Sequence, residues 1–182
     1  MQDRIGIILQ GMRNKAVLPF INGDLLDVAC GTNTLCQQYK KKHPDRTATG
    51  ADVYPWDGVD VIIENSGNLP FDDASFDTVT CVAAINHIPE RNEFLREAIR
   101  VLRPNGKFIA TMIPPKTSRV WHFLRSPWDV DQHERGMDDG EVFGFTRAQM
   151  KSMLLEHGFH SITLHPFMLC INTVYVAARP DK

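Results

Sequence analysis

Apolar residues recur along the chain at two spacings, that of a helix and that of strands. Near the start of the chain, within residues 1–22, four apolar residues fall at helical spacing: Ile5, Ile8, Leu9 and Met12. We therefore expect an amphipathic helix up to about Ala16, which packs on the rest of the fold through this apolar side.

Short apolar runs then alternate with helical patterns. Five of the runs have the length and residue types of strands, and they lie at 25–29, 47–52, 61–64, 76–82 and 107–113. Helices are expected at 34–42, between the fourth and fifth strands, and at 146–157, where Thr146 is a capping residue and Gly158 ends the helix. Two last strands, at about 161–165 and 170–178, form an expected hairpin.

This alternation predicts an α/β fold with a doubly wound, mostly parallel sheet and helices on both faces, because parallel strands need crossover connections. Ligands of such sheets bind beyond the carboxyl ends of the strands. The segments after Asp27, Asp52, Glu64 and Val82 should therefore converge on one cleft. We expect a single domain over 1–182, interrupted by a polar insertion at 114–145.

Composition narrows the class of protein. The 182 residues include 20 Lys and Arg and 22 Asp and Glu, and the formal charge of −2 disfavours a general nucleic-acid binder. Hydrophobic residues make up 43% of the chain, which indicates a folded protein. No apolar run approaches the length of a membrane helix, and no secretory signal is visible, so a cytoplasmic protein is expected. The four cysteines form no CxxC pair, and they are expected to be free, buried thiols.

Small residues follow Asp27 at the point where the first strand turns into a helix. Ala29, Cys30 and Gly31 allow the backbone a sharp turn and a close approach to a ligand. Asn33 fits the same turn, because asparagine tolerates a positive φ better than most residues. Asp52 closes the next strand, 25 positions after Asp27, where a carboxylate can accept both hydroxyls of a ribose. Together these residues indicate a nucleoside site.

Several segments resemble one known family in the correct order and spacing. They are 26–33, a glycine-rich first motif; 50–52, an acidic strand end; 69–77, the lead-in to a fourth strand; 100–107, a turn before a fifth strand; and 145–146 with 158–159, the frame of a last helix. In these segments the chain resembles the class I S-adenosylmethionine-dependent methyltransferases, and within them the methyltransferase type 11 group. The resemblance spans roughly 24–159.

The resemblance implies a Rossmann-like sheet of seven strands with an antiparallel last strand, and S-adenosyl-L-methionine as the cofactor. It places the cofactor along 27–33, with Ala29 and Gly31 at the methionine end. The ribose would lie at Asp52 and Val53, the adenine at Asn65 and Ser66, and Val82 with Ala83 would form the floor near the sulfur. The sequence departs from the family pattern at Ala29 and Asn33, which replace two glycines, and at Asn65, which replaces an acidic residue.

Methyl transfer from a sulfonium demands mainly alignment of the acceptor, so a general base matters only for an acceptor that arrives protonated. His87, just beyond the fourth strand, is the candidate for that base, although a histidine at a helix start without a catalytic task is an open alternative. The expected acceptor is a small molecule, and a homodimer is considered. Nucleic acid and membrane are not expected partners.

The insertion mixes histidines and carboxylates: His122, Asp129, Asp131, His133, Glu134, Asp138, Asp139 and Glu141. Their spacing matches no closed zinc site, so no metal is expected, and the segment is interpreted as a mobile lid over the substrate side. Its aromatic residues could form a wall of the substrate pocket: Trp121, Phe123, Trp128 and Phe143.

Two other functions stay open. One is a methyltransferase-like binding module that has lost catalysis, which the two missing glycines allow. The other is a nicotinamide-dependent oxidoreductase, although residues 29–34 lack the G-x-G-x-x-G pattern that such an enzyme needs.

Overall fold

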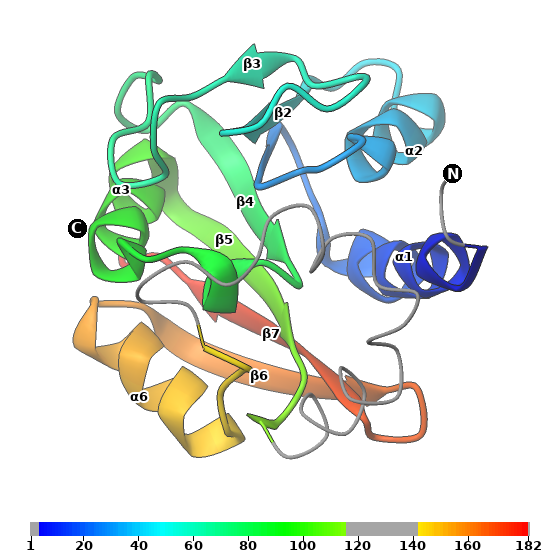
Figure 1. Cartoon of the computed structure of the whole chain (residues 1–182). Coiled ribbons are helices and arrows are strands. Elements are labelled where there is room, and N and C mark those ends of the chain that lie inside the picture. The colour runs from blue at the N-terminus through cyan, green and yellow to red at the C-terminus, as the bar shows by residue number, and fades with distance from the viewer. Residues whose placement is uncertain (1–3, 116–141, 182) are drawn as a thin grey trace.

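A computed structural model describes residues 4–115 and 142–181, and seven strands in this part of the chain form one sheet (Figure 1). The order across the sheet is β3-β2-β1-β4-β5-β7-β6. The strands are β1 (Leu25–Val28), β2 (Ala48–Asp52), β3 (Val61–Ile62), β4 (Phe76–Val82), β5 (Leu102–Met112), β6 (His160–Phe167) and β7 (Asn172–Ala178).

The first five strands pair in parallel, and β7 inserts between β5 and β6, antiparallel to both. The chain order reverses between β1 and β4, so a crevice at the carboxyl ends is expected next to these two strands. The predicted fold class is confirmed, including the antiparallel last strand and the hairpin that β6 and β7 form.

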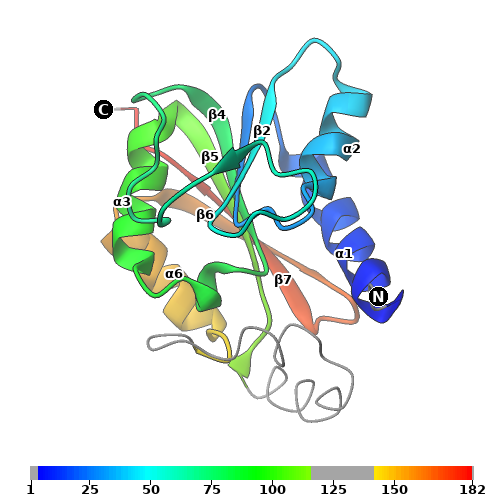
Figure 2. The same ribbon diagram turned by 45° about the horizontal axis from the view of Figure 1, so that its top comes forward.

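Helices cover both faces of the sheet (Figures 1 and 2). One face carries α1 (Arg4–Val17) and α2 (Thr34–Lys42), and the other carries α3 (Arg91–Val101) and α6 (Arg147–Glu156). Two short 3-10 turns complete the described elements, η1 (Leu18–Phe20) and η2 (Ile85–His87). None of the described helices is long and apolar enough to cross a membrane.

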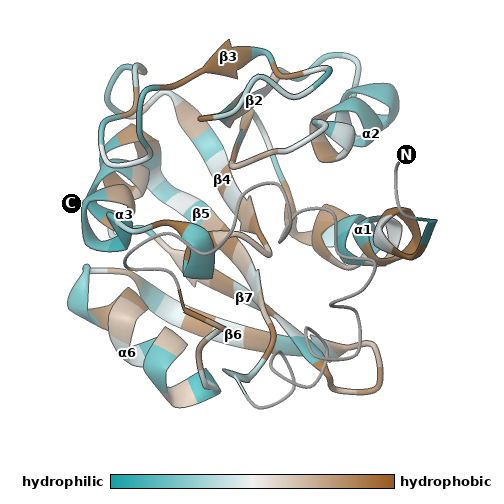
Figure 3. Cartoon of the chain, in the orientation of Figure 1, coloured by the Kyte–Doolittle hydropathy of each residue, from teal (hydrophilic) through white to brown (hydrophobic). Residues whose placement is uncertain are grey.

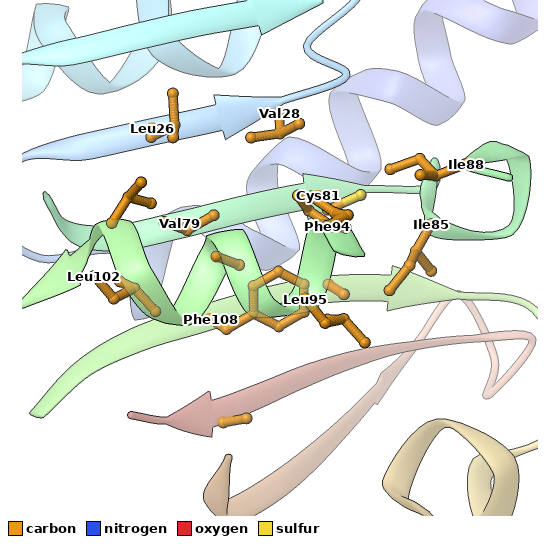
Figure 4. Packing of buried hydrophobic residues seen from close by; sticks show 14 of the residues in the cluster. Leu26, Val28, Val79, Cys81, Ile85, Ile88, Phe94, Leu95, Leu102 and Phe108 are labelled. Atoms are coloured by element: carbon orange, nitrogen blue, oxygen red, sulfur yellow. The ribbon is translucent and has the colours of Figure 1, made fainter. Parts of the chain in front are cut away.

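The central strands are apolar on both sides because each side is covered by helices. On the α3 side, Phe94 and Leu95 pack over Val79 and Phe108 (Figure 4). On the other side, Val17 of α1 packs in a cluster with strand and α2 residues, which include Leu25, Leu35, Tyr39, Ile109 and Val174. The two clusters hold the carboxyl ends of β1, β4 and β5 in fixed positions.

The sequence predicted the wrong side of α1 for packing. Of its apolar residues, Leu9 is buried, whereas Ile5, Ile8 and Met12 are exposed, and Figure 3 shows apolar ribbon at the outer end of this helix. The helix is rotated because Gln10 donates to Thr32 Oγ1 at 3.4 Å and Asn14 donates to Thr34 Oγ1 at 3.0 Å. These polar contacts turn α1 toward the loop after β1.

The turn expected at 104–106 lies inside a strand instead of before it. Leu102 pairs with Phe76, and Lys107 pairs with Thr78. Between these two pairings β5 advances by five residues while β4 advances by two, so β5 contains a bulge. Asn105 takes a left-handed conformation with φ 62° within this bulge. The fifth strand therefore begins at Leu102 and not at Lys107.

Candidate functional site

Left-handed backbone gathers at the carboxyl ends of β1 and β4, which are neighbours in the sheet. After β1, the φ angles of Ala29, Gly31 and Asn33 are 57°, 54° and 55°, and after β4 the φ of Ala83 is 57°. For alanine this conformation is costly, and such strain concentrates at ligand sites. The predicted sharp turn after Asp27 is present, and the left-handed conformation expected for Asn33 is confirmed.

Asp52 ties the end of β2 to this turn. Its Oδ2 accepts a hydrogen bond from the Gly31 amide at 2.9 Å, and its Oδ1 accepts one from the Tyr54 amide at 3.0 Å. A carboxylate offers about four acceptor positions, so two are left for the hydroxyls of a ribose. Val53, the next residue, is exposed beside it. The geometry therefore fits the predicted role of Asp52.

Asp27 is buried as deeply as Asp52 but has fewer described hydrogen-bond donors. Its Oδ1 accepts a hydrogen bond from Thr80 Oγ1 on β4 at 2.6 Å, and only 3% of the residue is exposed. Burial raises the pKa of Asp27 to about 7; the Thr80 hydroxyl opposes this rise, and the charge of Asp52 adds to it. The Asp27 carboxyl therefore changes its charge near neutral pH, where a cationic ligand would favour the ionised form.

The side chain of Asn33 faces the loop between β2 and β3. Its Nδ2 donates to the Gly58 carbonyl and to Asp60 Oδ2, both at 2.8 Å. Asp60 Oδ2 also accepts from the Gly50 amide at 2.8 Å. This side chain therefore fastens the loop, and any contact of Asn33 with a cofactor is left to its backbone.

The segment after β3 is held by α3. The Ser66 amide donates to Glu90 Oε1 at 2.9 Å, and the Leu69 amide donates to Glu97 Oε2 at 2.8 Å. Ser66 is buried and Asn65 is exposed. Glu90 was not predictable from the sequence, because only the fold brings this residue, 24 positions away, to Ser66.

At the end of β4, Val82 and the next residue, Ala83, are partly buried and lead into η2. The His87 ring is half-buried, and its amide donates to the Ala84 carbonyl at 2.7 Å. Asn86 is buried and holds Val142 twice, through its Nδ2 to the Val142 carbonyl and through its carbonyl to the Val142 amide, each at 3.0 Å. Asn86 was not predicted as a site residue, since its partner is distant in sequence.

Three of the four cysteines are buried, and Cys30 is one of them, in the turn after β1. Burial raises the pKa of the Cys30, Cys36 and Cys81 thiols, which keeps them neutral. All four cysteines are free as expected, but Cys170 is exposed, contrary to the expectation of burial, because it lies in the turn between β6 and β7. Residues 4–115 and 142–181 contain no group of three potential metal ligands. Most of the predicted lid, 116–141, lies outside the described residues.

The turn after β1, the carboxylate at the end of β2 and the antiparallel β7 occur together with a sequence match. A family model described as "Methyltransferase domain" matches residues 26–110. In sequence and in fold the chain is similar to the class I S-adenosylmethionine-dependent methyltransferases. S-adenosylmethionine is the cofactor of this family, as the sequence predicted.

Relatives of this chain include proteins named for quinone biosynthesis. The chain is 28% identical over 176 residues to a demethylmenaquinone methyltransferase of Thermotoga maritima, and the aligned region covers 84% of this chain and 76% of that protein. It is 32% identical over 111 residues to the ubiquinone/menaquinone biosynthesis C-methyltransferase UbiE of Rickettsia prowazekii, and this aligned region covers 50% of this chain and 45% of that protein. The match spans about half the length of most of these curated relatives.

Solved structures share the fold at low identity. A methyltransferase of Thermotoga maritima, described as a possible histamine N-methyltransferase, superimposes with a TM-score of 0.70 at 18% identity, over 92% of this chain and 88% of that chain. Human N-acetylserotonin methyltransferase superimposes with a TM-score of 0.68 at 12% identity, over 94% of this chain and 53% of that chain.

Proposed function

We propose that this chain binds S-adenosylmethionine across the carboxyl ends of β2, β1 and β4 and transfers its methyl group to a small-molecule acceptor. The observation that carries the proposal is the Asp52 carboxylate. It is fixed by the amides of Gly31 and Tyr54, it is buried, and it retains acceptor positions for a diol at the end of β2. A structural hydrogen bond alone would not require a carboxylate at this point.

Each part of the site has a proposed role toward the cofactor. Asp52 accepts hydrogen bonds from the ribose hydroxyls, and Val53 lies beside them. Asn65 and Ser66 face the adenine, and α3 keeps this segment in place through Glu90. The bound cofactor supplies an electrophilic methyl group on a good leaving group.

At the other end of the cofactor, the left-handed backbone at Ala29 and Gly31 gives the methionine part a close approach to the turn. The Asp27 carboxyl below this turn stabilises positive charge when it is ionised. Val82 and Ala83 form the floor near the sulfur and exclude water from the reacting methyl group.

The proposed acceptor is an aromatic ring carbon of a hydroxylated small molecule. Support comes from two relatives, a demethylmenaquinone methyltransferase and a ubiquinone/menaquinone biosynthesis C-methyltransferase. When a ring carbon is methylated, a proton must leave the ring or its hydroxyl. His87, half-buried at the end of η2, is the proposed acceptor of that proton.

The first test is cofactor binding. Calorimetry should detect binding of S-adenosylmethionine and S-adenosylhomocysteine but not of NAD. Asp52→Ala should weaken S-adenosylhomocysteine binding by about 1–3 kcal/mol, the usual cost of losing buried hydrogen bonds. Asp57→Asn is the matched control, because Asp57 is an exposed carboxylate of the same loop. Equal affinity of the Asp52 variant and the control would refute the ribose assignment.

The second test is turnover. Incubation with S-adenosylmethionine and a panel of reduced naphthoquinols and benzoquinols should release S-adenosylhomocysteine, and His87→Gln should slow this release without weakening cofactor binding. Binding without release from any acceptor would favour a module that has lost catalysis. Binding of NAD in place of the sulfonium cofactor would favour the oxidoreductase.

A further inference from the structure

Three polar atoms buried on the α1 side of the sheet have no hydrogen-bond partner in the described part of the chain: Arg13 Nε, Thr111 Oγ1 and Asn172 Nδ2. Thr111 and Asn172 are both fully buried. The Asn172 side chain is anchored at its other end, because Oδ1 accepts a hydrogen bond from the Thr173 amide at 2.8 Å. Since buried polar groups are normally paired, these three atoms call for an explanation.

Strand register places Thr111 and Asn172 together. Thr111 on β5 pairs with Val174 on β7, and Asn172 lies two residues before Val174. Ile109 and Val174 both face the α1 side, in the cluster with Val17. Because side chains alternate along a strand, Thr111 and Asn172 face the same side and are diagonal neighbours.

The course of α1 carries Arg13 toward this pair. The helix α1 runs from the carboxyl edge of the sheet, where Gln10 contacts Thr32, toward the amino edge, where η1 leads to the start of β1. Arg13 is one turn before Val17 on the same side of α1 and therefore lies closer to the carboxyl edge of the sheet. Thr111 follows Ile109 by two residues on the same side of β5 and is also closer to the carboxyl edge. The helix contacts β5 directly, and Figure 1 shows it between α2 and the β6–β7 turn.

The three groups share a chemical character. The guanidinium and the amide NH₂ are donors only, and the threonine hydroxyl can also donate. No described carboxylate forms an ion pair with Arg13, and burial lowers the pKa of its guanidinium, although arginine keeps its charge. A half-buried cation beside two further groups that can donate complements an oxyanion.

The position in the sheet separates this cluster from the cofactor. Asp52 and Asp27 lie on β2 and β1, whereas Thr111 and Asn172 lie on β5 and β7, on the far side of β4. Three strand spacings separate β1 from β7, or about 14 Å. We propose that Arg13, Thr111 and Asn172 form a subsite for an acidic oxygen, a carboxylate or phenolate, of the methyl acceptor. This inference rests on the proposed function, since an acceptor is what the far side of β4 would hold.

Calorimetry with a matched pair of probes tests the subsite. The full chain, saturated with S-adenosylhomocysteine, is titrated with 2-naphthoate and with 2-naphthamide, which has the same ring without the charge. The wild type should bind 2-naphthoate more tightly. Arg13→Gln should weaken 2-naphthoate binding about tenfold or more and leave 2-naphthamide unchanged. Lys15→Gln, which removes an exposed cation of the same helix, is the control and should have no effect.

Asn172→Asp provides a second, independent variant. Its carboxylate can still accept from the Thr173 amide, but it presents an oxygen where the free donor was, so 2-naphthoate binding should be lost. Thermal unfolding should show that Arg13→Gln is no less stable than the wild type, because it removes a buried charge without a described partner.

Three results would overturn the subsite. The first is equal binding of the two probes by the wild type, and the second is unchanged 2-naphthoate affinity in both variants. The third is a parallel loss of S-adenosylhomocysteine affinity in Arg13→Gln, which would assign the guanidinium to the carboxylate of the cofactor. Titration of 2-naphthoate without S-adenosylhomocysteine separates this inference from the proposed function. If the protein binds no sulfonium cofactor but binds 2-naphthoate with an affinity that depends on Arg13, the subsite is supported and the proposed methyl transfer is refuted.

Discussion

The Asp27 carboxyl is enclosed between β1 and β4 and has a single described hydrogen-bond donor, the Thr80 hydroxyl. With its pKa raised to about 7, the folded protein holds this proton more tightly than the unfolded chain does. The contribution of Asp27 to stability is therefore fully present below about pH 4 and is lost as the pH rises to about 7.

Replacement of this carboxyl should flatten the pH dependence of stability. Asp27→Asn can still accept from Thr80 but does not titrate. We expect the wild type to lose on the order of 2 kcal/mol more than the variant between pH 5 and pH 7. Urea denaturation at both pH values measures this difference, with Asp57→Asn, an exposed carboxylate, as the control. Parallel curves for the wild type and Asp27→Asn would contradict the raised pKa.

Gly50 and Asn33 form a contact that only a glycine allows. A Cβ at position 50 would lie 2.2 Å from Asn33 Oδ1, well inside any van der Waals distance. Gly50→Ala should therefore destabilise the protein by about 1–3 kcal/mol, as overpacking does. In an Asn33→Gly background, which keeps the left-handed backbone but removes the side chain, the same substitution should cost much less. Equal costs in both backgrounds, measured by urea denaturation, would place the strain elsewhere.

Residue chemistry made part of the site predictable. The positions of Asp27 and Asp52 at strand ends and of Gly31 in the turn were predictable, because a carboxylate at a strand end and a small residue in a turn are local signals. The orientation of the Asn33 side chain and the contact of Glu90 with Ser66 were not predictable, because both depend on segments more than 20 positions away. Arg13 was overlooked because its apolar neighbours Ile8 and Met12 dominate the helical pattern.

At the scale of elements, local signals predicted where α6 begins. The Thr146 side chain accepts from the Gln149 amide at 3.3 Å, and Gln149 Oε1 accepts from the Thr146 amide at 2.9 Å. Thr146 was predictable as the cap, because a threonine just before a helical pattern is a local signal, and the structure adds Gln149 as its partner three positions later. The rotation of α1 was not, because its hydrogen bonds to Thr32 and Thr34 exist only in the folded chain.

Loss of this cap should be measurable. Thr146→Ala removes the acceptor for the Gln149 amide and should cost about 1 kcal/mol of stability. Thr146→Ser keeps the hydroxyl and serves as the matched control. Thermal or urea unfolding of the two variants gives the comparison, and an alanine variant as stable as the serine variant would show that α6 does not depend on the capping bond.

For the whole molecule, the alternation of strands and helices was enough to predict a parallel sheet covered on both faces. The bulge in β5 was not predictable, because a proline, an asparagine and a glycine in succession usually mark a turn between elements. Here the Leu102 to Phe76 pairing before the bulge and the Lys107 to Thr78 pairing after it keep the segment within the sheet.

Amide hydrogen exchange should reproduce the layering of the sheet. The amides of β1, β4 and β5, paired on both sides and covered by helices, should exchange slowest, near the rate of global unfolding. The two-residue edge strand β3 and the first turn of α1, where Ile5 is exposed, should exchange fastest. Protection of β3 equal to that of β4 would contradict this order.

The insertion of β7 between β5 and β6 has a consequence for how the chain reaches this structure. One edge of β5 can be paired only after a strand that begins 60 residues beyond its end, at Asn172, has been synthesised. Until then a long apolar strand offers free amides and carbonyls to any other strand that it meets. On the ribosome, nascent chains of this protein should therefore be most prone to misassociation, and most in need of chaperones, after β5 emerges and before β7 does.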